Sequence, residues 1–377
     1  MKLVMAGGGT GGHLFPALAL AEEFRTRDHE TEIFFIGGRH GLEESLVPLY
    51  GYPVRLLGVE GIKRKKGLAR IRALVKAARS TIKAVGLLKE IGPAGVIGSG
   101  SYASAPVVAA ARLLGIKTAI LEQNALPGLT NRVLGRMVDR IYISFEETGA
   151  HFPASRTVLA GNPVRREIVA RASSRPKRGG PFTVLVFGGS QGATAVNAAF
   201  MDAAEYLTDI WPSLRVIHQT GSEGYRTAEA AYRRKNLKVE LKEFIDDMAG
   251  AYAAADLVVC RAGATSIAEI TAAGLAAILI PYPFASDNHQ EVNARSLADR
   301  GAAVMIRQDV LTGSVLADTI RRFFENPGEL VSVRERAGAL GRPGAAASIA
   351  GDFMGLLTGR AGRVRAGKAR GLGGERA

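Results

Sequence analysis

The sequence contains almost no cysteine and no long hydrophobic run. Cys260 is the single cysteine among 377 residues, which excludes an intrachain disulfide and a cysteine-based metal cluster. No apolar stretch reaches the roughly 18 residues that a membrane-spanning helix requires. Residues 1–7 are too short and reach glycine too early for a signal peptide, and they predict a first strand instead. We therefore expect a protein of the reducing cytoplasm.

Acidic residues are scarce in two parts of the chain. The formal net charge of +14 predicts an acidic partner, such as nucleic acid, anionic lipid or a phosphorylated substrate. Residues 61–89 contain ten Lys or Arg and no Asp or Glu, and residues 358–377 contain six basic residues against Glu375. Aromatic residues make up 6% and show no stacking pattern, so no nucleic acid is expected, although a basic RNA- or DNA-binding protein stays one alternative.

Alternating strand and helix patterns are abundant, and they occur in two similar halves. The length suffices for two domains, each with its own core. This alternation predicts βαβ units, and hence α/β architecture with two doubly wound, Rossmann-like domains. Ligands of such sheets bind at the carboxyl ends of the strands, here in a cleft between the domains. The predicted strands are residues 3–6, 32–36, 95–97, 117–121 and 140–144, then 182–187, 214–219, 239–243, 257–260 and 277–280.

A polar, basic stretch rich in Pro and Gly separates the halves, and residues 171–181 are interpreted as the linker. The domains are then residues 1–170 and 182–344. Residues 345–357 are predicted to form a last helix that packs back on the first domain, and residues 358–377 a disordered basic tail. The first helix is expected at residues 16–27, with Pro16 in its first turn.

A glycine-rich turn, Gly7-Gly8-Gly9-Thr10-Gly11-Gly12-His13, follows the first predicted strand. Glycines let the backbone approach a ligand closely, and the free N–H groups at a helix start attract anions. The spacing also satisfies the dinucleotide fingerprint, and Arg39 after the second strand would suit a 2′-phosphate. An NADP-dependent oxidoreductase is therefore a second alternative, and a tight turn without a ligand is a third.

The second half carries two further turns of this kind, which a single dinucleotide fold does not explain. Residues 188–192 follow a predicted strand and contain Ser190, whose hydroxyl can donate a hydrogen bond. Residues 261–266 offer backbone donors, two hydroxyls and a helix dipole to a diphosphate. Glu269 lies one turn further on, where it either accepts both hydroxyls of a ribose or is only a first-turn acid favoured by the dipole.

Seven short motifs occur in an order that resembles the MurG family, the GT-B-fold N-acetylglucosaminyltransferases of peptidoglycan synthesis. The resemblance extends from about Leu3 to about Leu357, and it is specific because of the order rather than any one motif. The motifs are Gly8-Gly9-Thr10-Gly11-Gly12-His13, Glu122-Gln123-Asn124, Gly161-Asn162-Pro163-Val164-Arg165, Gly188-Gly189-Ser190-Gln191-Gly192, Phe244-Ile245-Asp246-Asp247-Met248, Cys260-Arg261-Ala262-Gly263-Ala264, and Asp287-Asn288-His289-Gln290 with Asn293-Ala294.

The resemblance implies an inverting transferase that moves N-acetylglucosamine from UDP-GlcNAc to an undecaprenyl-diphosphate-linked N-acetylmuramyl-pentapeptide. The second domain would bind the donor, and the first would bind the acceptor lipid through Thr10, Gly11, Gly12 and His13. The acceptor's C4 hydroxyl would attack the anomeric carbon, which converts lipid I to lipid II. The implied donor contacts are the main chain of Ile245 for uracil, Glu269 for ribose, Ser190, Gln191, Ala264, Thr265 and Ser266 for the diphosphate, Arg165 for the nucleotide, and Asn124, His289 and Gln290 for the sugar.

This reaction needs a base for the acceptor hydroxyl and charge stabilisation on the leaving diphosphate. His13 is the candidate base, because neutral imidazole suits proton transfer near pH 7. The alternative is that His13 only caps the helix or binds phosphate, with Glu122 as a competing base. Helix starts and Ser190 would stabilise the leaving group, so neither metal nor cofactor is expected. The turn Gly100-Ser101-Tyr102 departs from the family's Gly-Gly-Tyr, and serine disfavours positive φ.

The basic segment also carries an apolar stripe at helical spacing. The stripe is interpreted as mostly core, whereas the basic residues would contact an anionic membrane surface at roughly 1 kcal/mol each. We therefore expect peripheral attachment to the cytoplasmic face of the bacterial inner membrane, and contact with other cell-wall synthesis proteins. The stripe consists of Leu68, Ile71, Val75, Ala78, Ile82 and Val85, and it follows Lys63-Arg64-Lys65-Lys66.

Overall fold

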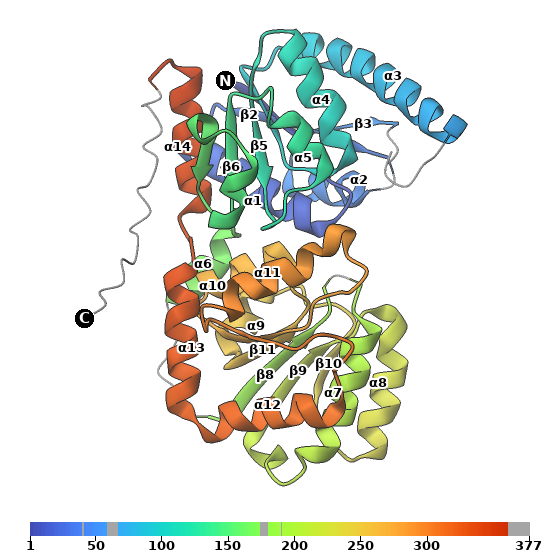
Figure 1. Ribbon diagram of the computed structural model, residues 1–377, viewed down its shortest axis with the longest axis vertical. Coiled ribbons are helices and arrows are strands. Elements are labelled where there is room, and N and C mark those ends of the chain that lie inside the picture. The colour runs from blue at the N-terminus through green and yellow to red at the C-terminus, as the bar shows by residue number, and fades with distance from the viewer. Residues whose placement is uncertain (40, 59–66, 174–179, 190, 361–377) are drawn as a thin grey trace, which may run out of the picture.

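The structure is a computed structural model, and it describes residues 1–39, 41–58, 67–173, 180–189 and 191–360. The chain forms two lobes, each built on a parallel sheet with helices on both faces (Figure 1). The predicted α/β class and its two doubly wound units are thereby confirmed. Within the described part of the chain, no helix combines the length and the apolar character needed to cross a membrane.

The first sheet has seven parallel strands in the order β3-β2-β1-β4-β5-β6-β7. The strand order reverses between β1 and β4, which makes their carboxyl ends the expected place for a ligand. The sequence pattern predicts five of these strands but misses the short strands β3 and β7 near the edges. The strands are β1 (Lys2–Ala6), β2 (Glu32–Gly38), β3 (Val54–Leu57), β4 (Gly95–Gly98), β5 (Lys117–Glu122), β6 (Arg140–Ile143) and β7 (Thr157–Leu159).

The first helix begins at Gly11, one turn earlier than predicted, so Pro16 lies in its second turn. Pro16 has no N–H to donate to the carbonyl of Gly12, and this carbonyl is therefore open to another donor. The helices of the first lobe are α1 (Gly11–Arg27), α2 (Leu42–Leu46), η1 (Val47–Tyr50), α3 (Gly67–Ile91), α4 (Ser101–Leu113), α5 (Leu129–Leu134), η2 (Glu146–His151), η3 (Ala154–Arg156) and α6 (Arg166–Ser173).

The second sheet has six parallel strands in the order β10-β9-β8-β11-β12-β13, and its order reverses between β8 and β11. Both faces are covered, so strand residues alternate between two cores: Val184 and Val186 face one, Leu185 and Phe187 the other. The sequence pattern misses only the two-residue strand β13. The strands are β8 (Phe182–Phe187), β9 (Leu214–Gln219), β10 (Glu240–Lys242), β11 (Leu257–Cys260), β12 (Ala276–Leu279) and β13 (Val304–Met305).

The last helix returns to the first lobe after the chain has completed the second (Figure 1). Phe353 packs edge-on against Phe24 of α1, with ring centroids 6.3 Å apart. Asp352 accepts hydrogen bonds from Tyr142 at 2.8 Å and Arg140 at 3.1 Å. The helices from the second lobe onward are α7 (Thr194–Tyr206), η4 (Trp211–Ser213), α8 (Ser222–Arg234), α9 (Met248–Ala254), α10 (Ala264–Ala272), η5 (Ser286–Asn288), α11 (His289–Ala298), α12 (Gly313–Glu325), α13 (Pro327–Leu340) and α14 (Ala345–Leu357).

Helix α3 turns a different face to the core than the sequence predicts. Val75 and Ile82 of the apolar stripe are 45% and 72% exposed, whereas Ser80, Ala84 and Leu88 are buried. Helix α3 packs against α4. Apolar periodicity identifies a helix face, but it does not say whether that face packs against the core. The interpretation of the stripe as core is wrong for Val75 and Ile82.

Several predicted features lie outside the described residues. They are the basic cluster 63–66, Ser190 and the tail from residue 361 onward. Residues 174–179 of the predicted linker are also outside, and α6 extends through Ser173 into the start of that stretch.

Candidate functional site

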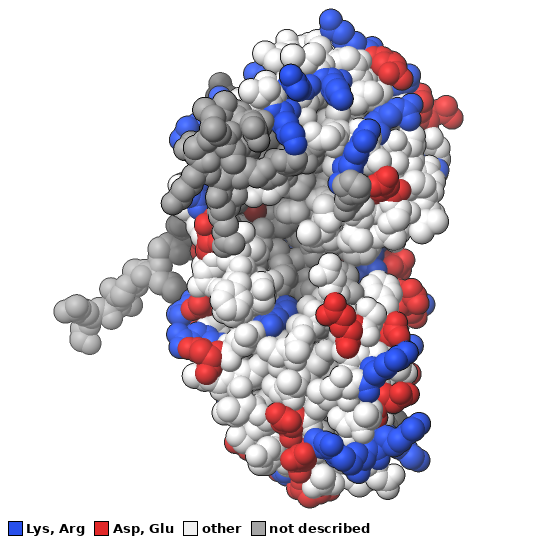
Figure 2. Space-filling view, turned by 90° about the vertical axis from the view of Figure 1, so that its right-hand side faces the viewer, with Lys and Arg blue, Asp and Glu red and all other residues white. Residues whose placement is uncertain are grey.

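A cleft of about 1950 Å³, open to solvent, lies between the two lobes. Residues that follow β1, β8 and β11 line it, so the reversal points of both sheets face one common space. Figure 2 shows the surface hollowed between the lobes. Gln191 is exposed and does not line the cleft. The other described candidates do: Thr10, Gly11, Gly12, His13, Asn124, Arg165, Ile245, Ala264, Thr265, Ser266, Glu269, His289 and Gln290.

A buried carboxylate shapes the first glycine-rich turn. Glu43 is 1% exposed and accepts hydrogen bonds from the backbone N–H of Gly9 at 2.5 Å and of Gly38 at 2.8 Å. Gly8 has a φ of 139°, and a Cβ there would collide with this carboxylate. The glycine is therefore required by an internal anchor as well as by any ligand. Sequence reasoning misses Glu43, and the only signal was an acidic pair, Glu43-Glu44, just after the glycines at 37, 38 and 41.

The first turns of α1 and α10 meet across the cleft. The Thr265 hydroxyl donates to the Gly12 carbonyl at 3.1 Å, and this is the carbonyl that Pro16 leaves without a helical partner. The Asn162 amide in turn donates to Thr265 Oγ1 at 3.4 Å. Two helix N-termini thus face the same space, and each is electrostatically suited to a phosphate group.

The His13 ring lies in the first turn of α1, beside the turn at Gly100. A Cβ on Gly100 would come within 2.7 Å of His13 Nδ1, so glycine leaves room for the ring. Burial lowers the pKa of His13, and the hydrogen-bonding neighbours Gln123 and Ser99 offset this effect only in part. The imidazole is therefore neutral at pH 7, as a general base must be.

Glu122 is a buried structural residue that holds a loop. It is 2% exposed, and its carboxylate accepts hydrogen bonds from Asn124 N at 3.0 Å, Gly128 N at 3.1 Å and Asn131 Nδ2 at 2.9 Å. Glu122 does not line the cleft. These contacts hold the loop after β5 that presents Asn124, and the geometry favours His13 over Glu122 as the base.

Glu269 and Arg165 form a buried network at the junction of the lobes. Glu269 accepts from Arg165 Nη2 at 3.0 Å and Nε at 3.2 Å, and from the Tyr252 hydroxyl at 3.1 Å. Burial raises the pKa of Glu269, while the Arg165 guanidinium acts in the opposite direction. Arg165 also stacks over the Phe15 ring of α1 at 5.1 Å. Sequence reasoning misses Tyr252 and Phe15, because ordinary core positions give no distinct motif.

Asn124 is held in place from the opposite lobe. Asn293, which is 0% exposed, donates to Asn124 Oδ1 at 3.2 Å and accepts from Ala125 N at 2.9 Å. Its amide also donates to the Ala262 carbonyl at 3.2 Å, next to the start of α10. Asn293 therefore links the loop after β5 to the loop after β11.

The remaining candidates form the walls of the cleft. Ile245 is buried, and Phe244 beside it is 49% exposed. His289 begins α11 and its Nδ1 contacts the Ser286 carbonyl at 2.7 Å, while Gln290 Oε1 accepts from Tyr282 N at 2.9 Å. Across the described residues, no three His, Cys, Asp or Glu side chains are grouped to hold a metal ion.

Two Rossmann-like lobes whose reversal points face one cleft define the GT-B class of nucleotide-sugar enzymes. The glycosyltransferase family 28 N-terminal domain matches residues 3–143, and the glycosyltransferase family 28 C-terminal domain matches residues 183–347. The chain belongs to this family and, within it, to the MurG transferases, as the following relatives show. The oxidoreductase alternative is thereby removed.

Two relatives bear the name UDP-N-acetylglucosamine--N-acetylmuramyl-(pentapeptide) pyrophosphoryl-undecaprenol N-acetylglucosamine transferase. That of Myxococcus xanthus is 48% identical and covers 95% of this chain and 93% of its own. That of Syntrophus aciditrophicus is 46% identical, and the match covers 95% of this chain and 99% of its own. Acinetobacter baumannii MurG is similar in structure, with a TM-score of 0.78 and 33% identity over 95% of this chain and 99% of its own. The family and fold predicted from the seven motifs are confirmed.

Proposed function

We propose that this enzyme transfers N-acetylglucosamine from UDP-GlcNAc to the C4 hydroxyl of undecaprenyl-diphosphate-linked N-acetylmuramyl-pentapeptide. This converts lipid I to lipid II in peptidoglycan synthesis, the activity that the names of the relatives describe. The observation that carries the proposal is the meeting of the α1 and α10 N-termini at one cleft through Thr265 and Gly12. Two such helix ends suit two diphosphates, one of the nucleotide and one of the lipid.

The donor occupies the side of the cleft formed by the second lobe. The Ile245 main chain reads uracil, Glu269 accepts the ribose hydroxyls, and the start of α10 holds the diphosphate. Arg165, which now pairs with Glu269, is close enough to that carboxylate to contact the same nucleotide. Asn124, His289 and Gln290, which line the same cleft, contact the sugar.

The chemical step is a single displacement with inversion at the anomeric carbon. The acceptor C4 oxygen forms the new bond to that carbon while the bond to the UDP oxygen breaks, and His13 takes the hydroxyl proton. Gln123 Nε2 donates to the Ser99 carbonyl at 2.8 Å, and neither Gln123 Oε1 nor His13 Nδ1 has a hydrogen-bond partner among the described residues. The α10 N-terminus stabilises the charge on the leaving UDP.

The face formed by α3, α4 and α5 attaches the enzyme to the cytoplasmic face of the inner membrane. These helices pack side by side, and Ile82, Leu129 and Val133 are exposed on α3 and α5. Arg79 and Lys83 are exposed on α3 next to Ile82. Figure 2 shows Lys and Arg side chains beside uncharged surface on this lobe. Apolar side chains that enter the interface, together with basic ones that face anionic headgroups, suit a peripheral protein.

A transfer assay tests the proposal directly. Labelled UDP-GlcNAc and a lipid-diphosphate-linked N-acetylmuramyl-pentapeptide should give labelled lipid product, whereas UDP-glucose should react far more slowly. Transfer to water alone, or equal use of both donors, would contradict the proposed activity.

A further inference from the structure

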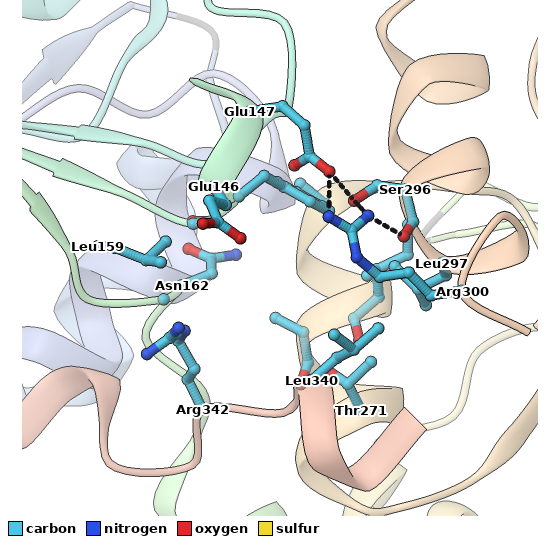
Figure 3. A pocket seen from close by; sticks show the side chains of 16 residues that line it. Glu146, Glu147, Leu159, Asn162, Thr271, Ser296, Leu297, Arg300, Leu340 and Arg342 are labelled. Carbon is cyan, nitrogen blue, oxygen red and sulfur yellow. Dashed lines mark hydrogen bonds and ion pairs between the residues drawn. The ribbon is translucent and has the colours of Figure 1, made fainter. Parts of the chain in front are cut away.

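A second cavity lies behind α10, with about 680 Å³ of empty space that includes the open solvent at its mouth (Figure 3). Thr265, Ser266 and Glu269 line the catalytic cleft from one side of α10. Ala268 and Thr271 line the second cavity from the opposite side. The helix that starts at the donor diphosphate position is therefore a wall shared by two cavities. We call the second one the rear cavity.

The rear cavity contains a buried acceptor that lacks a donor. Asn162 is 3% exposed, and its Oδ1 has no hydrogen-bond partner within the described part of the chain. Its Nδ2 is already committed to Thr265, which fixes the orientation of the amide. An unpaired buried acceptor is destabilising, so a ligand N–H at this position would supply the missing hydrogen bond.

Charged groups of both signs flank this amide. Figure 3 shows Asn162 between the carboxylate of Glu146 and the guanidinium of Arg342. The Arg342 side chain packs on Gly161. At the other end, Arg300 pairs with Glu147 at 2.7 Å and is therefore already neutralised. The cavity thus offers an anion, an uncharged acceptor and a cation, in that order, along one wall.

The opposite wall is mostly apolar. It consists of Ile267 and Ala268 of α10 with Leu297 and Leu340, all from the second lobe, while Leu159 of the first lobe lies beside Asn162 (Figure 3). A ligand here touches both lobes at once. Complementarity to these surfaces requires a cationic donor and an anion a few bonds apart, attached to an apolar group.

We propose that the rear cavity binds a small zwitterion with an apolar side chain, which is an apolar α-amino acid or a dipeptide. Its carboxylate pairs with Arg342, its ammonium donates to Asn162 Oδ1 and faces Glu146, and its side chain packs on the apolar wall. Asn162 also holds Thr265, and Thr265 holds Gly12, so occupancy changes how the two helix starts face each other. The site therefore regulates donor binding, and this regulatory part rests on the proposed function.

Calorimetry on the full chain tests the binding site without any donor present. The probes are leucine, phenylalanine and alanyl-alanine, with acetate and isobutylamine as compounds that carry one charge only. At least one zwitterion should bind with 1:1 stoichiometry, and the single-charge compounds should bind at least tenfold more weakly. Absence of binding by all three zwitterions at millimolar concentration would overturn the proposal.

Variants locate the bound probe. Ala268→Phe fills the cavity and should abolish binding, and Arg342→Gln removes the cation and should weaken binding about tenfold, the value of one charge-assisted hydrogen bond. Arg226→Gln, at an exposed arginine of α8, is the matched control and should leave binding unchanged. Arg342 is exposed, so its replacement keeps the test valid if Ala268→Phe does not fold. Undiminished binding in Arg342→Gln would overturn the assignment.

The regulatory part is tested by the affinity for UDP with and without a saturating zwitterion. The dissociation constant of UDP should change about fivefold or more, and by reciprocity UDP should change the affinity of the zwitterion equally. An unchanged UDP affinity would overturn the regulatory role. Failure of UDP to bind under any condition would instead overturn the proposed function, while the rear cavity would still be judged by the probes alone.

Discussion

His13 acquires its chemistry from the residues around it. Its ring is buried against Gly100 and Gln123, which favours the neutral form. Glu43 and Glu122 are equally buried carboxylates, yet both bind backbone N–H groups and shape loops. At the scale of the residue, burial alone does not identify a catalytic group. What matters is whether a lone pair remains free and faces the cleft.

Replacement of the proposed base separates chemistry from binding. We expect His13→Ala to lower kcat by about 10²- to 10⁴-fold, the usual contribution of a general base, with little change in the Kd of UDP-GlcNAc. Steady-state kinetics and calorimetry measure the two quantities. Wild-type turnover in this variant would remove His13 from the mechanism.

The pH dependence provides an independent check on His13. Because burial lowers its pKa in the fold, the ring stays neutral as the pH falls through its ordinary value of about 6.5. The wild-type rate should therefore stay level there and decline only at lower pH. A decline in rate centred above pH 6.5 would contradict a lowered pKa of His13.

Glu269 is expected to act on donor binding. Glu269→Ala removes an acceptor of charge-assisted hydrogen bonds and should raise the Kd of UDP-GlcNAc about tenfold or more. It should also lower the Tm, because the buried Arg165 loses its partner. The matched control is Glu167→Ala, since Glu167 is 62% exposed and lies 3.8 Å from the same guanidinium. A donor Kd unchanged in Glu269→Ala would contradict the ribose role.

Ser101 has a φ of 70°, in the left-handed region where a residue with a side chain is strained. The glycine that the family has at this position would adopt the same φ without strain. Ser101→Gly should therefore stabilise the fold by about 1 kcal/mol, the lower end of such strain. Ser348→Gly, within α14, should have the opposite sign because helical glycine is unfavourable. Urea denaturation measures both, and a destabilised Ser101→Gly would show that the strain is negligible.

At the scale of the element, a proline in α1 makes possible a hydrogen bond between the two lobes. Pro16 leaves the Gly12 carbonyl without an intrahelical donor, and Thr265 of α10 supplies the donor instead. Helix α3 illustrates a different point. Its buried face contains Ser80, Ala84 and Leu88, whereas Val75 and Ile82 are left on the surface beside basic residues. Packing against a neighbour, rather than hydrophobicity alone, decided which face became core.

The exposed face of α3 predicts membrane binding that depends on lipid charge. Flotation with anionic vesicles should recover the enzyme, and neutral vesicles should recover far less. Arg79→Glu with Lys83→Glu should weaken anionic binding about thirtyfold or more, at about 1 kcal/mol for each basic residue lost. Arg226→Glu with Arg233→Glu on α8 is the control with the same change in charge. Equal recovery with both vesicle types would contradict the electrostatic part.

At the scale of the whole molecule, a few buried polar side chains fix the position of one lobe relative to the other. Asn293 bonds to both Asn124 and Ala125 from the opposite lobe, and Arg165 bonds to Glu269. Helix α14 adds an apolar contact far from the cleft. The cleft therefore depends on the relative placement of two bodies that each have their own core.

Asn293 is expected to position Asn124 without touching the substrates. Asn293→Ala leaves the N–H of Ala125 buried and unpaired, which should cost about 1–3 kcal/mol of stability. It should also raise the KM for UDP-GlcNAc more than it lowers kcat, because Asn124 stays in the site and loses only the hydrogen bond that positions it. Arg295→Ala, at an exposed residue of the same helix, is the control. A variant with unchanged stability and KM would contradict the positioning role.

Motifs and strand patterns were sufficient to predict the α/β class, the family, ten of the thirteen strands in the described part of the chain and about half of the residues that line the cleft. These features are encoded locally, because each glycine-rich turn follows its own strand and the reversal of strand order brings the turns together. The short strands β3, β7 and β13 were not predictable, since they owe their pairing to neighbouring strands.

The amino-acid sequence by itself determined the two doubly wound lobes, the order of the functional motifs and the presence of a basic apolar helix. Only the tertiary structure decided which face of α3 is exposed, that Glu43 anchors the first turn and that α10 separates two cavities. The physical reason is that these properties depend on contacts between residues distant in sequence. Local propensity carries no information about such contacts until both lobes have packed.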